Sequence, residues 1–88
     1  MKIEFWNRDN NTCRVLFEKS DRFAGKQVRF KGDYTSRGYY FKKTSLQWLV
    51  NNGESELDLQ PIEDSVKAEL IEYMIDKARE QGINFIAV

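Results

Sequence analysis

A single stretch of this chain, residues 62–81, carries the apolar spacing of an α-helix. Val66, Leu70, Met74 and Ala78 recur at every fourth position, and Ile71 widens the stripe. Acidic and basic residues occupy the opposite face. A helix with one apolar stripe must bury that stripe against another element, so the rest of the chain has to supply a surface for it.

The ends of this helix carry recognisable signals. Pro61 suits a first-turn position, where its missing N–H costs no hydrogen bond. Glu63 and Asp64 place negative charge at the positive end of the helix dipole. Gly82 stands where a left-handed C-terminal cap is favoured. These signals predict a helix from about residue 62 to residue 81.

Alternation of polar and apolar residues predicts strands in most of the remaining chain. The expected strands are residues 2–5, 12–18, 27–31, 39–43, 46–50 and 83–88. Gly32 weakens the third strand, and the last one is apolar on both faces, so we do not expect it to be a bare edge. The pattern predicts one α+β domain, residues 1–88. It has a mostly antiparallel sheet of five to six strands, one C-terminal amphipathic helix packed on one face, and a final strand.

Composition excludes several classes of chemistry. The 88 residues include no histidine and one cysteine, Cys13, so neither an internal disulfide nor a thiolate–imidazole zinc site can form. Cys13 alternates with Val15 and Phe17, which indicates a core position. No phosphate-binding loop, dinucleotide fingerprint or nucleophile elbow is present. We expect a binding protein rather than an enzyme, with no catalytic residues, cofactor or metal. No apolar run long enough for a membrane span or a signal peptide is visible.

Charge is balanced in total but divided along the chain. Residues 1–52 carry a net charge of +6, and residues 53–88 carry −6. The two halves either pair across the fold or leave an acidic and a basic surface, each able to attract a partner. The candidate acidic surface comprises Glu54, Glu56, Asp58, Glu63, Asp64, Glu69, Glu72 and Asp76. The spacing of its first members does not match a calcium-binding EF-hand loop.

A basic and aromatic stretch, residues 37–43, supports an alternative. Arg37-Gly38-Tyr39-Tyr40-Phe41 partly matches the strand with which RNA-recognition domains stack on bases. That architecture needs a helix between its first two strands, and residues 7–25 show no helical period. We therefore expect Tyr39 and Phe41 on the core face and Tyr40 on the other. A different nucleic-acid-binding fold remains the second hypothesis, with phosphate contacts from Lys26, Arg29, Lys31, Lys42 and Lys43.

The second half of the chain resembles a known family. Gly38-Tyr39-Tyr40-Phe41, then Ser45-Leu46-Gln47-Trp48, an amphipathic helix and a final apolar strand are similar to the Immunity protein 74 family. These are small α+β immunity proteins of bacterial polymorphic-toxin and contact-dependent inhibition systems. The similarity covers roughly residues 26–88, and it departs from the family pattern directly after Trp48.

The resemblance implies a non-catalytic cytoplasmic antidote that binds the C-terminal effector domain of its toxin. A nuclease with a basic cleft fits the acidic surface, which would steer association. Trp48 is the candidate aromatic anchor, and a core position is the alternative for its ring. The expected partner is the toxin domain, rather than a membrane, a nucleic acid or a second copy of this chain.

Overall fold

The computed structural model describes residues 1–51 and 56–88, and they form an α+β fold with seven strands and one α-helix. The strands are β1 (Lys2–Asn7), β2 (Thr12–Leu16), β3 (Gln27–Thr35), β4 (Gly38–Phe41), β5 (Gln47–Leu49), β6 (Leu59–Pro61) and β7 (Phe85–Ala87). The helix α1 spans Asp64–Glu80. Short 3-10 helices are η1 (Arg8–Asn10), η2 (Lys43–Ser45) and η4 (Glu56–Asp58). The predicted fold class is confirmed, with β6 added to the expected strands.

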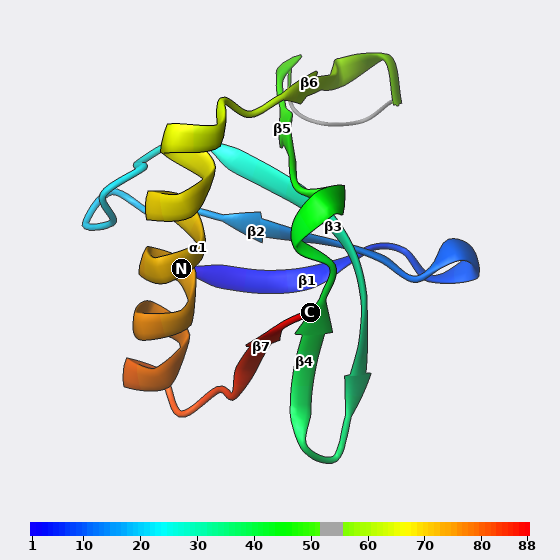
Figure 1. The fold of residues 1–88 in the computed structure, drawn as a ribbon, viewed down its shortest axis with the longest axis vertical. Coiled ribbons are helices and arrows are strands. Elements are labelled where there is room, and N and C mark those ends of the chain that lie inside the picture. The colour runs from blue at the N-terminus through cyan, green and yellow to red at the C-terminus, as the bar shows by residue number, and fades with distance from the viewer. Residues whose placement is uncertain (52–55) are drawn as a thin grey trace.

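The sheet follows the order β1-β2-β3-β4-β7, and β5 joins it by pairing with β3 and β6. All pairings are antiparallel except that of β7 with β4. The strand β3 is shared: residues 27–29 pair with β5, and residues 32–35 pair with β4. Figure 1 shows α1 standing along one side of this curved sheet, with β7 beside β4. The prediction of a mostly antiparallel sheet is confirmed.

The strand β7 lies at one end of the sheet order, so the expectation that it is not a bare edge is wrong. Its apolar character has another cause. Phe85 and Ala87 pack into the core, while Ile86, on the other face, is half-buried. Burial of the two faces of a strand is independent of whether its edge is paired.

The core lies between the sheet and α1. Leu70, Met74 and Ala78 are fully buried on the inner side of the helix, as the four-residue spacing predicts. Beneath them the rings of Phe30, Phe41 and Phe85 cluster, with centroids separated by 5.7 Å (Phe30–Phe41), 5.4 Å (Phe30–Phe85) and 4.3 Å (Phe41–Phe85). Cys13, Val15 and Phe17 are buried in the same cluster, which confirms their predicted face.

The helix begins two residues later than its signals suggest. Pro61 is the last residue of β6, where it pairs with Gln47, and Glu63 is the N-cap of α1. Pro61 therefore does not occupy the first helical turn; it is tolerated because β6 pairs on one side and needs no N–H on the other. The other end follows the prediction: Gly82 has φ +76°, and the Ile83 N–H bonds the Ala78 carbonyl at 2.8 Å. Within the described residues, no helix is long and apolar enough to cross a bilayer.

Candidate functional site

The inward stripe of α1 determines which carboxylates face solvent. With Leu70 and Met74 buried, Glu69, Glu72 and Asp76 lie on the outer face at a spacing of three and four residues, and all three are exposed. Together with Arg22 and Tyr73 they line a shallow hollow of about 290 Å3. We call these three carboxylates and their hollow the acidic face of α1.

Ion pairing neutralises this face only in part. Glu69 pairs with Arg22, and Asp76 pairs with Arg79 one turn along the same helix, at 3.7 Å. Among the residues that the structure describes, Glu72 makes no ion pair, and no carboxylate of α1 pairs with a Lys or Arg of the sheet. The two oppositely charged halves of the chain therefore do not cancel here, and the acidic face keeps a carboxylate at its centre.

A buried polar network holds the segment 18–25 against this face. The Tyr73 hydroxyl donates to Asp21 at 2.8 Å and accepts the Arg22 N–H at 3.1 Å. Burial alone would raise the pKa of Asp21, but bonds from the Glu18 N–H, the Met1 ammonium group and the Tyr73 hydroxyl lower it below its usual value. The pKa of Tyr73 is raised mainly by burial and also by the neighbouring Asp21. Asp21 therefore stays ionised and fixes the position of Arg22 beside Glu69.

The structure does not bring all the predicted acidic residues together. Glu54 lies outside the described residues, and only the backbone of Glu56, in η4, is described. Asp58 is half-buried at the end of η4, and its carbonyl accepts the Val50 N–H at 2.9 Å. Glu63 and Asp64 are exposed at the start of α1. The candidate acidic surface thus divides into a helix-start group and the acidic face.

Trp48 fits both predicted positions, the core and the exposed anchor, in part. It packs against the core and is also partly exposed. It contacts Phe23 with centroids 6.2 Å apart, and Phe23 in turn contacts Tyr73 at 5.9 Å. The Lys26 ammonium lies 4.8 Å from the Trp48 ring centre, a cation–π contact. Trp48 and Lys26 also line a hollow of about 370 Å3 between β3, β5 and β6. Phe23 therefore links Trp48 to the acidic face through a row of aromatic rings.

Sequence reasoning missed Arg22, Phe23 and Tyr73 as parts of this site. Residues 20–25 break the strand pattern, and the aromatic Phe23 in this segment is the one signal that they are more than a solvent loop. Tyr73 falls beside the apolar stripe of the helix, where periodicity alone indicates core. Their shared role becomes visible only when the loop is placed against α1.

The basic, aromatic strand is arranged as predicted. Phe41 is buried and Tyr39 packs on the core, while Tyr40 is on the other face, where it lines a hollow of about 290 Å3 with Lys31 and Lys42. Arg29, by contrast, is 8% exposed, and its guanidinium bonds the Gln47 side chain at 3.0 Å and the Ser45 carbonyl at 3.3 Å. The expectation that Arg29 contacts phosphate is therefore wrong, because η2 and β5 cover it.

The carboxylates of these surfaces do not form a metal site in the described residues. Across residues 1–51 and 56–88, no group of three His, Cys, Asp or Glu side chains is placed to hold a metal ion.

Comparison with protein-family models, with curated proteins and with solved structures gives no match to this chain. The acidic face and the basic strand are consequently the features from which a function can be inferred.

Proposed function

We propose that this chain is a non-catalytic antidote that binds the effector domain of a bacterial toxin and neutralises it, docking through the acidic face of α1. The observation that carries the proposal is the incomplete charge pairing of that face, with Glu72 unpaired between Glu69 and Asp76. An effector domain with a basic, phosphate-binding cleft, such as a nuclease, is the complementary partner. Opposite potentials of this kind accelerate encounter and discriminate against wrong partners.

The exposed surface of the chain is large enough for such a role. A helix of 17 residues is about 25 Å long. A specific interface needs roughly 800 Å2 from each partner. The chain exposes 5636 Å2, so about one seventh of its surface would suffice. The half-exposed Trp48, joined to the face through Phe23, adds the kind of aromatic side chain that contributes most binding energy at interfaces.

The test is co-expression with the toxin domain encoded beside this chain, followed by measurements of growth and of complex formation. Glu72→Lys should lower the association rate about tenfold and flatten its dependence on salt, with a smaller change in dissociation. Asp9→Lys makes the same charge change in η1, at the tip of the β1–β2 hairpin, on the opposite side of the molecule from α1 (Figure 1). It should leave both rates unchanged.

Growth arrest without a detectable complex would overturn the proposal. Equal effects of Glu72→Lys and Asp9→Lys would show that net charge, rather than the acidic face, controls binding.

The second candidate function, binding of single-stranded nucleic acid, has one observation in its favour. Tyr40 lies in one hollow with Lys31 and Lys42, so a base could stack on the ring while the ammonium groups bind phosphates. Binding of a single-stranded RNA or DNA oligomer should then weaken steeply with salt, and Tyr40→Ala and Lys42→Ala should weaken it further. Glu72→Lys should not weaken this binding, which separates the two candidates.

A further inference from the structure

The outer edge of β7 lacks the charges, the irregular register and the proline that occur at the other edges of the sheet. The strand β1 carries the charged residues Lys2 and Glu4 and has a register irregularity between Phe5 and Asn7. The strand β6 ends in Pro61. Charges, irregular register and proline are the usual means by which natural sheets prevent an edge from pairing with another chain. The sequence of β7, Phe-Ile-Ala, has none of them.

Hydrogen bonds on either side of β7 show which backbone groups face this edge. The Asn84 carbonyl accepts the Tyr39 N–H at 2.8 Å, and the Val88 N–H donates to the Phe41 carbonyl at 2.9 Å. Residues of a strand alternate in direction, so residues 84, 86 and 88 turn their backbone groups toward β4. The N–H and C=O groups of Phe85 and Ala87 therefore point away from β4, and β4 is the strand that pairs with β7 among the described residues.

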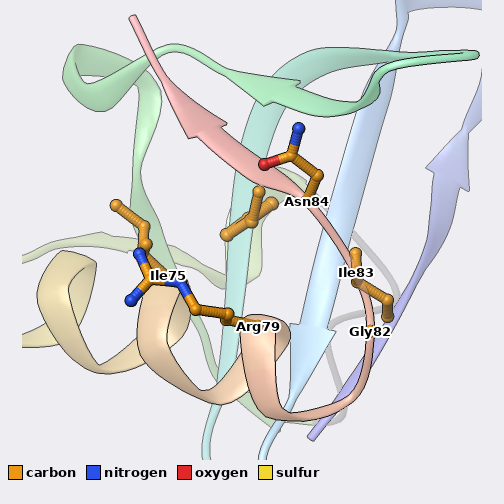
Figure 2. A pocket seen from close by; sticks show the side chains of 6 residues that line it. Ile75, Arg79, Gly82, Ile83 and Asn84 are labelled. Carbon is orange, nitrogen blue, oxygen red and sulfur yellow. The ribbon is translucent and has the colours of Figure 1, made fainter.

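The helix α1 stands beside the start of this edge, where Phe85 is 4% exposed, and Ala87 farther along the strand is half-buried. A hollow of about 310 Å3 lies between the C-terminal half of α1 and the start of β7, and it is lined by Ile75 and Arg79 of α1 and by residues 82–85. Figure 2 shows Ile75 and Arg79 of the helix on one side of this hollow, and Ile83 and Asn84 on the segment that leads into β7 on the other. An extended peptide pairs at about 4.8 Å from its neighbour, and this hollow offers an apolar side chain and a guanidinium beside that path.

The charges around β7 indicate the chemistry of the peptide. Three hollows that border residues 82–88 contain a cation: Arg79 beside α1, Arg37 beside the β3–β4 turn, and Lys42 next to Val88. Two carboxylates lie near these cations: Asp76, which is paired with Arg79, and Asp33. The remaining positive charge favours acidic side chains on an incoming strand.

We propose that β7 accepts an acidic, extended segment of a partner protein, which adds a strand to the sheet through the backbone groups of Phe85 and Ala87. This surface adjoins the acidic face of α1 through the Asp76–Arg79 ion pair, but it uses the edge of β7 rather than that face, so the inference goes beyond the proposed function. Backbone hydrogen bonds supply affinity in such strand addition, and side-chain pockets supply specificity. Here Ile75 offers apolar contact, while Arg79 and Arg37 select acidic residues.

The experiment uses the full chain, labelled with 15N, and a capped peptide that alternates valine and glutamate. At millimolar peptide, amide exchange at Phe85 and Ala87 should slow about tenfold, and the resonances of Arg79 should shift. A peptide that alternates valine and lysine should bind about tenfold more weakly. Equal binding of the two peptides would overturn the acidic specificity, and unchanged exchange at Phe85 and Ala87 would overturn strand addition.

Two variants at one position separate backbone pairing from side-chain contact. Ala87→Pro removes the outward N–H and leaves the bonds to β4 in place, so it should weaken peptide binding about tenfold while β4 resonances stay unchanged. Ala87→Ser keeps the N–H and should bind within about twofold of the natural chain. Equal binding by both variants contradicts the proposal. Exchange at Phe85 and Ala87 should not slow when the chain is concentrated without peptide. If it does slow, a second copy of this chain pairs with β7, and the proposal of an acidic partner segment is overturned. Glu72→Lys should leave peptide binding intact. A failure of strand addition at β7 can therefore be told apart from a failure of toxin binding through the acidic face.

Discussion

Cys13 illustrates how a single side chain is controlled by its position in the sheet. The residue is fully buried, and burial, with a smaller contribution from Asp33, raises the pKa of its thiol from 9.0 to about 11. The thiol is therefore neutral and unreactive in the folded chain. Iodoacetate should modify it only at the rate at which the domain opens.

This raised pKa makes a prediction about stability in alkaline solution. The contribution of the neutral thiol to the free energy of unfolding is fully present below pH 9, the ordinary pKa of the thiol. It is lost as the pH rises toward about 11. The loss should reach up to about 3 kcal/mol. Urea unfolding at pH 8 and at pH 11 measures it, with Cys13→Ala as the control. The variant should lose less stability over that interval, and identical losses would contradict the burial argument.

Arg29 shows why exposure of a charged residue is hard to predict from alternation. It stands opposite Arg14 and Gln47, on the sheet face away from Val28 and Phe30, as an exposed arginine would. Its burial comes from η2, which folds over that face and offers the Ser45 carbonyl. Such covering depends on contacts between distant segments, whereas the positions of Cys13 and Phe41 follow from local alternation alone.

At the scale of elements, the helix was predictable because its period repeats over several turns. Two strand features were not. The strand β6 is three residues long and contains proline, so it carries no alternation to detect. The strand β3 continues through Gly32 to Thr35, although glycine usually weakens a strand. A Cβ at Gly32 would lie 1.9 Å from the Tyr40 carbonyl oxygen, so this glycine allows a close approach of β4 rather than ending β3.

Packing of α1 on the sheet depends on Leu70. Leu70→Ala should lower the free energy of unfolding by about 3 kcal/mol, because the side chain is fully buried. Leu70→Asp should abolish the folded state, because it buries an unpaired charge. Ala68→Asp places the same charge on the exposed side of the helix and should cost less than about 1 kcal/mol. Melting curves followed by circular dichroism distinguish these variants, and an unchanged curve for Leu70→Asp would contradict the packing.

At the scale of the whole molecule, the basic and acidic halves of the chain remain only partly separate surfaces in the fold, because Arg22 of the first half pairs with Glu69 of the second. The acidic face of α1 was predictable because helical spacing places Glu69, Glu72 and Asp76 on one side. Its partial neutralisation by Arg22 was not, since Arg22 and Glu69 are 47 residues apart in the chain. The edge of β7 was also outside the reach of sequence patterns, which describe the faces of strands but not their neighbours.

The parallel pairing of β7 with β4 should protect the chain against self-association. A variant that ends at Gly82 lacks Phe85, which stacks on Phe41 at 4.3 Å and closes the aromatic cluster. The exposed ring and the newly open edge of β4 should make this variant self-associate, which light scattering at increasing concentration would detect. A variant that lacks only Val88, whose side chain is mostly exposed, should stay monomeric. If both variants scatter light equally, β7 is not what protects β4.

The same pairing has a consequence for biosynthesis. Translation proceeds from the N-terminus, so β1 to β4 can form their hairpins as soon as they leave the ribosome, each next to its predecessor. The strand β4 must then wait for more than forty further residues before β7 arrives. During that interval the nascent chain displays an unpaired edge of β4 and an uncovered Phe41. A slowly translated stretch between residues 42 and 84 would prolong this interval, so the speed of synthesis there would influence the yield of native protein.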